Sequence, residues 1–182
     1  MKKSNLIILI SLGILFLLTI SFQLSVHNHI KKGEIEGVGL FVSQNRDLAS
    51  FSKLEVTGKF KVLFRQDTIT SLKIDAPKST MDSIKTEVKN NQLRIYKSIK
   101  THAKDTITVF ISNPELEDLT IQSKAYLSSM NLISGDTISL SIKGKSKLNI
   151  HLDYNHINCT KDQTSILNLK GDTQKINFST ME

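Results

Sequence analysis

The stretch ISLSIKGKSKLNIHLDYNHINCTKDQTSILNLKGDTQKINF, residues 138–178, decides the fold because its apolar residues recur at one constant interval. The sequence numbers of Ile138 and Ile157 differ by 19, and the same interval leads back to Leu119 and on to Ile176. A second series with the interval of 19 starts two positions later and comprises Ile121, Leu140, Cys159 and Phe178. Two parallel apolar series with one period predict a chain that coils and stacks on itself as a β-solenoid.

A second strand is predicted in each coil, after a polar turn such as residues 143–147. Its apolar residues keep the interval of 19 in the pairs Leu148 and Leu167, and Ile150 and Leu169. Polar residues recur in the same way, in the pairs Asn149 and Asn168, Asn158 and Asn177, and Asp153 and Asp172. Stacked amides can hydrogen-bond along the axis at the strand spacing of about 4.8 Å. Stacked carboxylates repel, so we expect the aspartates at an open corner.

The body of the chain from Asp47 onward alternates apolar and polar residues, which predicts strands nearly throughout. One face of the first long run is predicted to carry Leu54, Val56, Gly58, Phe60, Val62 and Phe64. Asn90-Asn91 separates two shorter alternating runs and predicts a hairpin turn, because asparagine tolerates positive φ. No segment after Val26 has a convincing helical stripe.

Four stretches carry a resemblance to a known family. They are FSKLEVTGKFKV at 51–62, IKTEVKNNQLRI at 84–95, ISNPEL at 111–116 and LTIQS at 119–123. In this order they resemble the head-GIN domain of autotransporter-adhesin-like proteins, and the resemblance runs from about Asp47 to the C-terminus. Each motif is degenerate, so the resemblance depends on the ordered set.

The resemblance implies a right-handed parallel β-helix-like core, found in secreted or surface proteins of Bacteroidetes-type bacteria, and it carries over no catalytic residue. Coils of the family usually turn on Gly-Ser-Gly. Here only Gly144 is kept, with Ser123-Lys124-Ala125 and Asp162-Gln163-Thr164 at the equivalent turns. We therefore expect residues 47–182 to form an all-β solenoid domain with a less regular, partly antiparallel N-terminal part.

The front of the chain, residues 5–26, has no charged residue and is rich in Leu and Ile. At about 1.5 Å per residue it is long enough to cross the hydrocarbon core of a bilayer. Two interpretations are open: a transmembrane anchor, favoured because no Ala-x-Ala cleavage site is present, or a cleaved signal peptide. Lys31 and Lys32 follow the stretch closely, so the positive residues on its two sides are nearly balanced, but N-terminal lysines usually dominate for a first segment. We therefore expect residues 1–4 in the cytoplasm and the bulk of the chain outside it. Residues 27–46 are predicted to be a linker or a loosely attached first strand.

Net charge limits the classes of binding partner that the sequence predicts, and the cysteine count limits the possible disulfides. The formal net charge is +7, a mild excess that suits an anionic glycan or lipid headgroups, although scattered lysines are ordinarily only solvated. No compact basic cluster with interleaved aromatic residues is present, so nucleic acid is not predicted as a partner. The single cysteine, Cys159, can form no internal disulfide and lies at an inward position, where a thiol behaves as a small hydrophobic group.

No group of residues identifies a reaction. Asp153 and Asp172, one coil apart, could hold a cation or cleave a polysaccharide, but exposed corner residues are the more common outcome. His27 and His29 form a His-x-His pair without a third ligand nearby. The remaining histidines, which show no ligand spacing, are His102, His151 and His156. We therefore predict no catalytic, cofactor-binding or metal-binding residue and no enzymatic activity.

The leading hypothesis is a non-enzymatic cell-envelope protein, anchored in the membrane through residues 5–26, whose extracytoplasmic β-solenoid serves adhesion or surface interaction. Its outward Ser, Thr, Asn and Lys side chains can hydrogen-bond a glycan or an envelope polymer. The alternative is structural: the last coil, residues 175–179, leaves a strand edge uncovered that invites pairing with a second copy. A polysaccharide-active β-helix enzyme is the third class. Substitutions for a binding test would begin at Lys143, Lys145 and Lys147.

Overall fold

The computed structural model of the chain describes residues 13–24, 40–98, 107–171 and 176–180. The chain forms two compact units, Met1–Gly39 and Leu40–Glu182, so the second begins before Asp47. In the first unit, residues 13–24 are helical. Within the described ranges, no helix is both long enough and apolar enough to cross a membrane. The predicted anchor of residues 5–26 lies partly outside these ranges.

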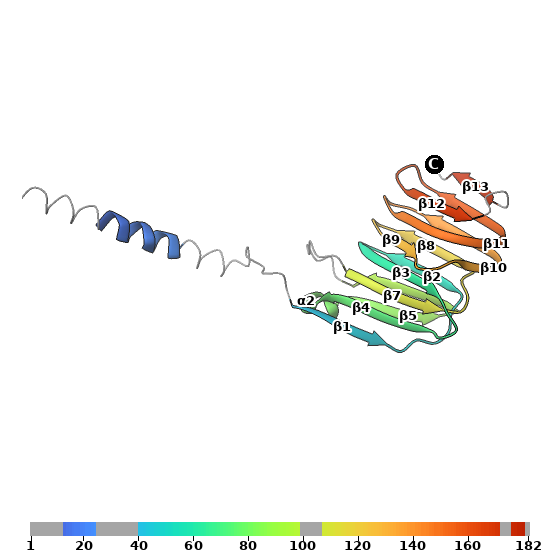
Figure 1. Cartoon of the computed structure of the whole chain (residues 1–182), viewed down its shortest axis with the longest axis horizontal. Coiled ribbons are helices and arrows are strands. Elements are labelled where there is room, and N and C mark those ends of the chain that lie inside the picture. The colour runs from blue at the N-terminus through green and yellow to red at the C-terminus, as the bar shows by residue number, and fades with distance from the viewer. Residues whose placement is uncertain (1–12, 25–39, 99–106, 172–175, 181–182) are drawn as a thin grey trace, which may run out of the picture. The chain divides into compact units, whose positions relative to one another are not determined.

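The second unit is built almost entirely from strands (Figure 1), which confirms the all-β class. In chain order its elements are β1 (Phe41–Arg46), β2 (Lys53–Thr57), β3 (Phe60–Gln66), β4 (Ser71–Pro77), α2 (Lys78–Met81), β5 (Ile84–Lys89), β6 (Gln92–Lys97), β7 (Ile107–Asn113), β8 (Asp118–Gln122), β9 (Tyr126–Ser129), β10 (Ile133–Ile142), β11 (Lys147–Lys161), β12 (Ile166–Gly171) and β13 (Ile176–Thr180). The sequence does not predict α2, because a helix of four residues is too short to produce an apolar stripe.

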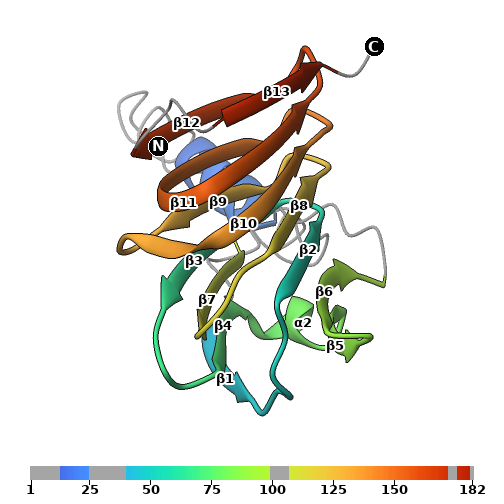
Figure 2. The same cartoon turned by 90° about the vertical axis from the view of Figure 1, so that its right-hand side faces the viewer.

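The described strands form one curled mixed sheet (Figure 2). Their order is β1-β4-β7-β3-β9-β11-β10-β8-β2-β6-β5, and β12 and β13 each pair with β11. The antiparallel pairs are β1 with β4, β4 with β7, and β5 with β6, all in the N-terminal part. Every other pair is parallel. The fold is therefore a curled sheet in which parallel pairs dominate towards the C-terminus.

Two predictions about the N-terminal part can be compared with this sheet. Asn90 and Asn91 form the predicted hairpin between β5 and β6, with φ of 51° and 61°, and Lys89 lies beside Gln92. Residues 41–46 form strand β1, which agrees with the second of the two alternatives, a first strand, and β1 pairs with β4 along its whole length. Arg46 attaches β1 further, because its Nη1 donates to the carbonyl oxygen of Ile84 at 2.9 Å.

In the C-terminal part, the predicted interval of 19 is confirmed. Parallel pairing places Ile138 beside Ile157 and Ile157 beside Ile176. The second strands align in the same way, since Leu148 lies beside Leu167. The second apolar series is aligned in the order Leu140, Cys159 and Phe178.

The first step of the series differs from the prediction. Leu119 lies beside Leu140, and Ile121 beside Ile142, so the interval between these neighbours is 21 and not 19. The predicted alignments of Leu119 with Ile138 and of Ile121 with Leu140 are therefore wrong by two positions. A shift of two keeps every apolar residue of a strand on the inward side, so the burial pattern cannot reveal it.

Four turns of the chain have a forward step of constant length, whereas the length of the return varies. The residues at which these forward steps begin lie beside one another in the sheet, and so do the residues at which they end. The sequence numbers of the two ends differ by eight in each case: Leu54 and Val62, Leu119 and Leu127, Leu140 and Leu148, and Cys159 and Leu167. The step from β6 to β7 is longer, since Leu93 lies beside Leu54, Val109 lies beside Val62, and their sequence numbers differ by 16. The return advances the sequence number by 11 from Leu148 to Cys159 but by 13 from Leu127 to Leu140. The first coil returns only after residues 67–116, which contain β4, α2, β5, β6 and β7.

We call the turns inside the forward step the corner side; it comprises residues 58–59, 123–125, 143–146 and 162–165. Gly58 and Gly144 lie there with φ of +115° and +67°, which favour glycine. A side chain on Gly144 would also meet the backbone nitrogen of Ser123 at 2.9 Å. The predicted single run from residue 54 to residue 64 is thus two strands, because the chain turns at Gly58.

Buried hydroxyl groups join successive corners from the inside. Ala125, Ser146 and Ser165 precede the second strand in three successive coils and are at most 5% exposed. The amide of Ala125 donates to the Ser146 hydroxyl, and the amide of Ser146 donates to the Ser165 hydroxyl, both at 3.2 Å. Outside them, the amide of Lys124 donates to the carbonyl oxygen of Gly144 at 2.9 Å. These contacts link the corners at 123–125, 143–146 and 162–165 to one another.

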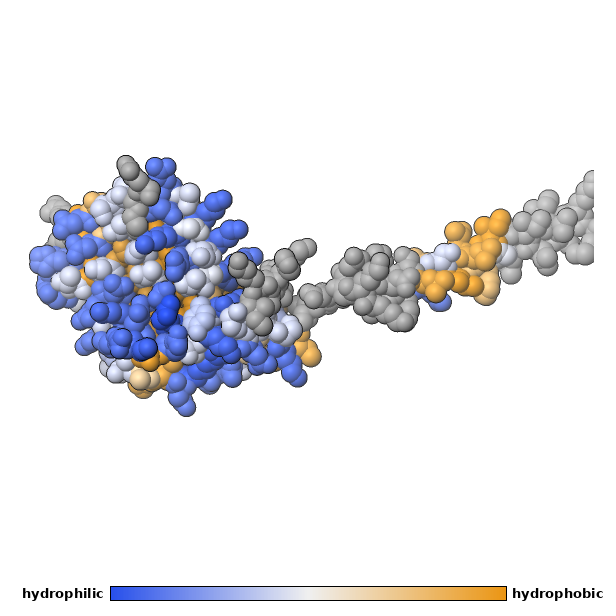
Figure 3. Space-filling view, turned by 180° about the vertical axis from the view of Figure 1, so that it is seen from behind, coloured by the Kyte–Doolittle hydropathy of each residue, from blue (hydrophilic) through white to orange (hydrophobic). Residues whose placement is uncertain are grey.

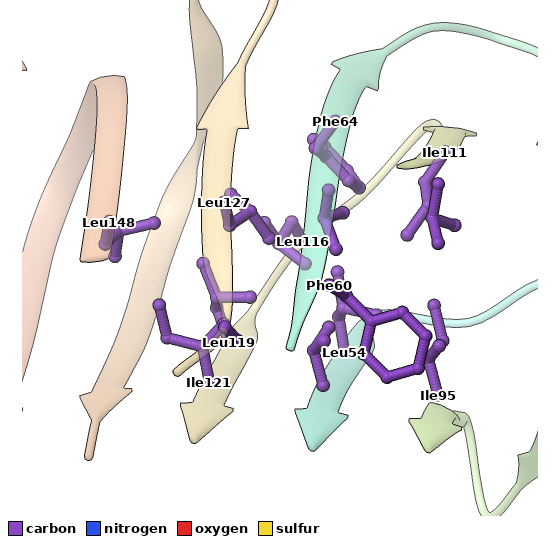
Figure 4. Close-up of a cluster of buried hydrophobic side chains, with 14 of the residues drawn as sticks. Leu54, Phe60, Phe64, Ile95, Ile111, Leu116, Leu119, Ile121, Leu127 and Leu148 are labelled. Carbon is purple, nitrogen blue, oxygen red and sulfur yellow. The ribbon is translucent and has the colours of Figure 1, made fainter. Parts of the chain in front are cut away.

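The interior of the coils is apolar, and Figure 4 shows the labelled side chains converging on it from opposite strands. Leu54, Leu119, Leu127 and Leu148 are 0% exposed. Burying one such side chain contributes about 1.5–3 kcal/mol to folding. At the C-terminal end of the stack Leu167 is only partly buried, so the core thins towards β12 and β13.

Candidate functional site

The coil stack has two outer faces. Along each strand, residues that point to an outer face alternate with residues that point into the apolar interior. The basic face is formed by the outward side chains of β3, β9, β12 and residues 147–151 of β11. The hydroxyl face is formed by those of β2, β8, β13, residues 139–142 of β10 and residues 156–161 of β11. Most of the surface visible in Figure 3 on residues 40–182 is hydrophilic, as expected for outward positions of this kind.

Parallel pairing arranges the basic face in rows across the strands. The first row consists of Lys61, Tyr126, Lys147 and Ile166. The second row consists of Leu63, Ser128, Asn149 and Asn168. In the third row His151 lies beside Lys170. Cations therefore flank a central row of hydroxyl and amide groups.

The basic face carries four formal positive charges and no carboxylate on the strand segments that define it. Lys61, Arg65, Lys147 and Lys170 are exposed, and none of them has an ion-pair partner among the described residues. The next outward carboxylate along β11 is Asp153, which lies past this face where β11 pairs with β10. The positive charge is thus uncompensated within the face.

An open groove of about 540 Å³ lies on the basic face. Its polar lining includes Ser128, Asn149, Asn168, His151 and Lys170. The Asn168 amide donates to Oδ1 of Asn149 at 2.7 Å, and the Asn149 amide donates to the Tyr126 hydroxyl oxygen at 3.0 Å. The predicted amide ladder at these positions is confirmed, and it holds both side chains in place on the groove floor.

The hydroxyl face has a different chemistry. Thr120, Ser141, Thr160 and Ser179 form one row across four strands, and the last two hydroxyl groups lie 3.0 Å apart. Glu55 continues the row on β2, and its Oε2 pairs with Nε of Arg94 at 3.1 Å. Charges of both signs are therefore present and partly paired on this side.

Another depression, of about 460 Å³, lies where the chain returns between coils, and its lining includes Glu117, Asp136 and Tyr154. Its polar groups have structural partners. Glu117 accepts a hydrogen bond from Ser52 at 2.6 Å, and the Tyr154 hydroxyl donates to the Leu116 carbonyl oxygen at 2.7 Å. Desolvation by burial, together with Glu117, raises the pKa of Tyr154 to about 12. A phenol held in its neutral form here supports the fold.

The residues weighed from the sequence fall in separate places. Asp153 is exposed, while Asp172 lies outside the described residues, as do His27, His29 and His102. His156 is exposed at the bend of β11. Lys143 and Lys145 lie at a corner, and Lys147 lies on the basic face. His151, for which the sequence predicts no metal-ligand role, and Lys170, for which it predicts no role, line the groove together. Their interval of 19 is the sequence signal that could have predicted their proximity.

Cys159 is a core residue in the structure. It is 1% exposed, and burial raises the pKa of its thiol above the usual value, with Lys161 opposing this in part. A thiol kept protonated inside a core is a poor nucleophile. Over the ranges that the structure describes, no group of three His, Cys, Asp or Glu residues could hold a metal ion.

Comparisons with known proteins agree with this architecture. An adhesin described as “putative” from Bacteroides fragilis NCTC 9343 has a similar structure, with a TM-score of 0.66 and 17% identity, over 70% of this chain and 61% of that one. A “putative lipid binding protein” from Parabacteroides distasonis ATCC 8503 gives a TM-score of 0.55 and 13% identity, over 69% and 64%. At these identities the likeness shows the fold alone. The present chain spans less than two thirds of either structure's length.

No curated protein matches the chain. Residues 50–182 match the family described as “Putative auto-transporter adhesin, head GIN domain”, which is well over half of the sequence. This chain therefore belongs to the head GIN domain family of auto-transporter-adhesin-like proteins.

Proposed function

We propose that the chain is a non-enzymatic cell-envelope protein that presents its stacked coils, in a β-helix-like arrangement, for adhesion to a repeating polymer. The observation that carries this proposal is the alignment of like polar side chains at strand spacing on both outer faces. Asn149 with Asn168 and Thr160 with Ser179 are the clearest pairs. A ladder of donors and acceptors with one period suits a ligand that is itself periodic, such as a glycan.

Adhesion is tested with the full chain, purified in a non-ionic detergent and coupled to beads. Beads carrying the folded chain are expected to be retained on at least one immobilised envelope polysaccharide, and beads carrying heat-unfolded chain are not. Size-exclusion chromatography of the soluble polymer after incubation is expected to show unchanged length. Equal retention of both bead types would contradict adhesion by the fold, and a shortened polymer would point to an enzyme instead.

Membrane attachment through residues 5–26 is part of the same proposal. It is supported by the absence of charged residues from this stretch and by the two lysines that precede it. In cells that produce the protein, the full chain is expected in the membrane pellet after an alkaline carbonate wash. A variant lacking residues 5–26 is expected in the soluble fraction. Recovery of the full chain in the carbonate wash would contradict a retained anchor.

Self-association is a second candidate, favoured by the C-terminal end of the stack. Among the described strands, β12 and β13 pair only with β11, so each has a free edge. Phe178 on β13 is 64% exposed although its register position faces inward. Unpaired strand edges with nearby apolar surface can join a second copy by strand addition.

Sedimentation velocity of the full chain in detergent, over a wide concentration range, tests this candidate. Phe178→Ser is expected to weaken association. Ile69→Ser, which removes a side chain that is 71% exposed in the turn between β3 and β4, serves as the matched control. A chain that stays monomeric at the highest concentration would rule the candidate out.

A further inference from the structure

We propose that the groove on the basic face binds an acidic polysaccharide, with Lys147 and Lys170 facing its anionic groups and Asn149 and Asn168 facing its hydroxyl groups. The inference rests on the proposed function and specifies its ligand class. It adds a site, a charge requirement and named contact residues to the general expectation of adhesion.

Charge asymmetry between the two outer faces is the first argument. The basic face has four exposed cations without a carboxylate on the same strand segments. On the hydroxyl face, by contrast, Asp118 lies beside Lys53, and Glu55 forms an ion pair with Arg94. Lysines that serve only solubility would be expected to be spread over both faces together with acids. Their segregation produces a positive potential over one side of the sheet, which attracts an anionic ligand.

The spacing of the cations is the second argument. Lys61 and Lys147 lie in one row with the strand of Tyr126 between them, so their backbones are about 9–10 Å apart, two strand spacings. His151 and Lys170 lie beside each other on adjacent strands. Lys170 lines the groove, and Lys61 and Lys147 lie in the row of outward residues next to it. Charges at multiples of the strand spacing can therefore meet successive anionic groups of an extended chain that crosses the strands at the groove.

The polar groups that line the groove favour a polysaccharide over other anionic polymers. The centre of the groove consists of amides and a hydroxyl group, which can exchange hydrogen bonds with the many hydroxyl groups of sugars. A single-stranded nucleic acid would need several aromatic stacking platforms, and Tyr126 is the one Phe, Tyr or Trp among the outward positions of the strand segments that define this face. A bilayer surface would need a continuous apolar patch where the asparagines lie. These two partners become outcomes of the test.

The test measures binding of the full chain, in non-ionic detergent, to immobilised polygalacturonate and to the same polymer with its carboxylates methyl-esterified. The native chain is expected to bind the acidic polymer, and the esterified polymer much more weakly. The double variant Lys147→Gln/Lys170→Gln is expected to lose roughly tenfold or more in affinity, as removal of two charge-assisted contacts implies. Added salt is expected to weaken native binding, because the contacts are exposed.

Lys53→Gln/Lys89→Gln is the matched control, since it removes the same two charges from β2 and β5 on the other side of the stack. It is expected to change the affinity by less than about twofold, and thermal unfolding should show both variants equally folded. The proposal is overturned if both double variants weaken binding equally, if the esterified polymer binds as well, or if only phosphatidylglycerol vesicles or single-stranded DNA bind. Retention on a neutral envelope glycan with no binding to polygalacturonate would reject the acidic ligand and leave the proposed function standing; retention on no polymer would reject both.

Discussion

The corner side and the return side of the coil stack belong to the same coils but differ in how strongly they fix the length of the chain. The forward step advances the sequence number by eight from β2 to β3, from β8 to β9, from β10 to β11 and from β11 to β12. The step from β6 to β7, which pair with β2 and β3, is the exception and advances it by 16, from Leu93 to Val109. The return advances it by 11 between the last coils, by 13 after β9, and by 57 between Val62 and Leu119. Hydrogen-bonded turns and buried serines constrain the corners at 123–125, 143–146 and 162–165, while the return of the first coil accepts a segment of five elements, β4, α2, β5, β6 and β7. Since loop-closure cost grows slowly with length, such an insertion has a modest energetic effect.

The largest expected effect comes from inserting residues on each side. Gly-Ser inserted between Gly144 and Lys145 displaces the contacts of the corner, including that of the Gly144 amide with Oδ2 of Asp162 at 2.6 Å. We expect a loss of at least about 3 kcal/mol of unfolding free energy. The same insertion between Thr68 and Ile69, in the return of the first coil, is expected to cost under about 1 kcal/mol. Urea denaturation measures both, and equal losses would remove the distinction between the two sides.

A smaller effect on stability is expected from a substitution that keeps the length of the corner but disfavours the backbone conformation of one residue. Gly144→Ala places a side chain at φ +67° and 2.9 Å from the Ser123 nitrogen, and should cost about 1–3 kcal/mol. Lys145→Gly relieves the φ of 63° at the next residue and is expected to be neutral or stabilising by up to about 1 kcal/mol. Thermal unfolding compares them; a stabilising Gly144→Ala would contradict the assigned corner geometry.

On the return side, Tyr154→Phe removes the hydrogen bond to the buried Leu116 carbonyl oxygen and should cost about 1–2 kcal/mol. The pKa of Tyr154 is raised to about 12 in the folded protein. The stability that the neutral phenol contributes is therefore fully present below the ordinary tyrosine pKa near 10. That contribution is lost as the pH rises from about 10 to about 12. Denaturation at several pH values should show a steeper alkaline loss for the native chain than for the variant. Parallel pH profiles would contradict this role.

The smallest effect is expected at Asp162, which is partly exposed to solvent. The hydrogen bond from the Gly144 amide, with others from Ser165 and Thr164, lowers the pKa of its carboxyl group to about 2. Its stabilising contribution is therefore present above the ordinary aspartate value and is lost as the pH falls from about 4 to about 2. The melting temperature of the native chain should fall more over this range than that of Asp162→Asn. A variant with the same acid dependence would show that the carboxylate does not hold the corner.

Sequence periodicity predicted the strand alignment in the parts of the molecule where the forward step and the return both have constant length. The alignment of Ile138 with Ile157 and the hairpin at Asn90-Asn91 depend on local spacing and turn chemistry, and both are confirmed. The neighbours Leu54 and Leu119 are separated in the sequence by the long segment that contains β4, α2, β5, β6 and β7, and no local pattern encodes that pairing. The two extra positions in the return after β9 shifted the predicted register of Leu119 without changing which side chains face inward.

The candidate site was only partly predictable for the same reason. The interval of 19 brings His151 to Lys170 and Asn149 to Asn168, so one half of the groove could be derived from the sequence. Lys61 joins the basic face through the pairing of β3 with β9, across the long return. The absence of carboxylates from that face becomes visible only when strands distant in the sequence are placed side by side.

Backbone NOE contacts of Ser141 test the central claim, the register of the stacked coils, most directly. The register predicts cross-peaks that connect the backbone of Ser141 with that of Thr160 on one side and with that of Thr120 on the other. Cross-peaks that instead connect Thr120 with Ser139 would establish a uniform interval of 19, and the absence of contacts between these strands would contradict the stack itself.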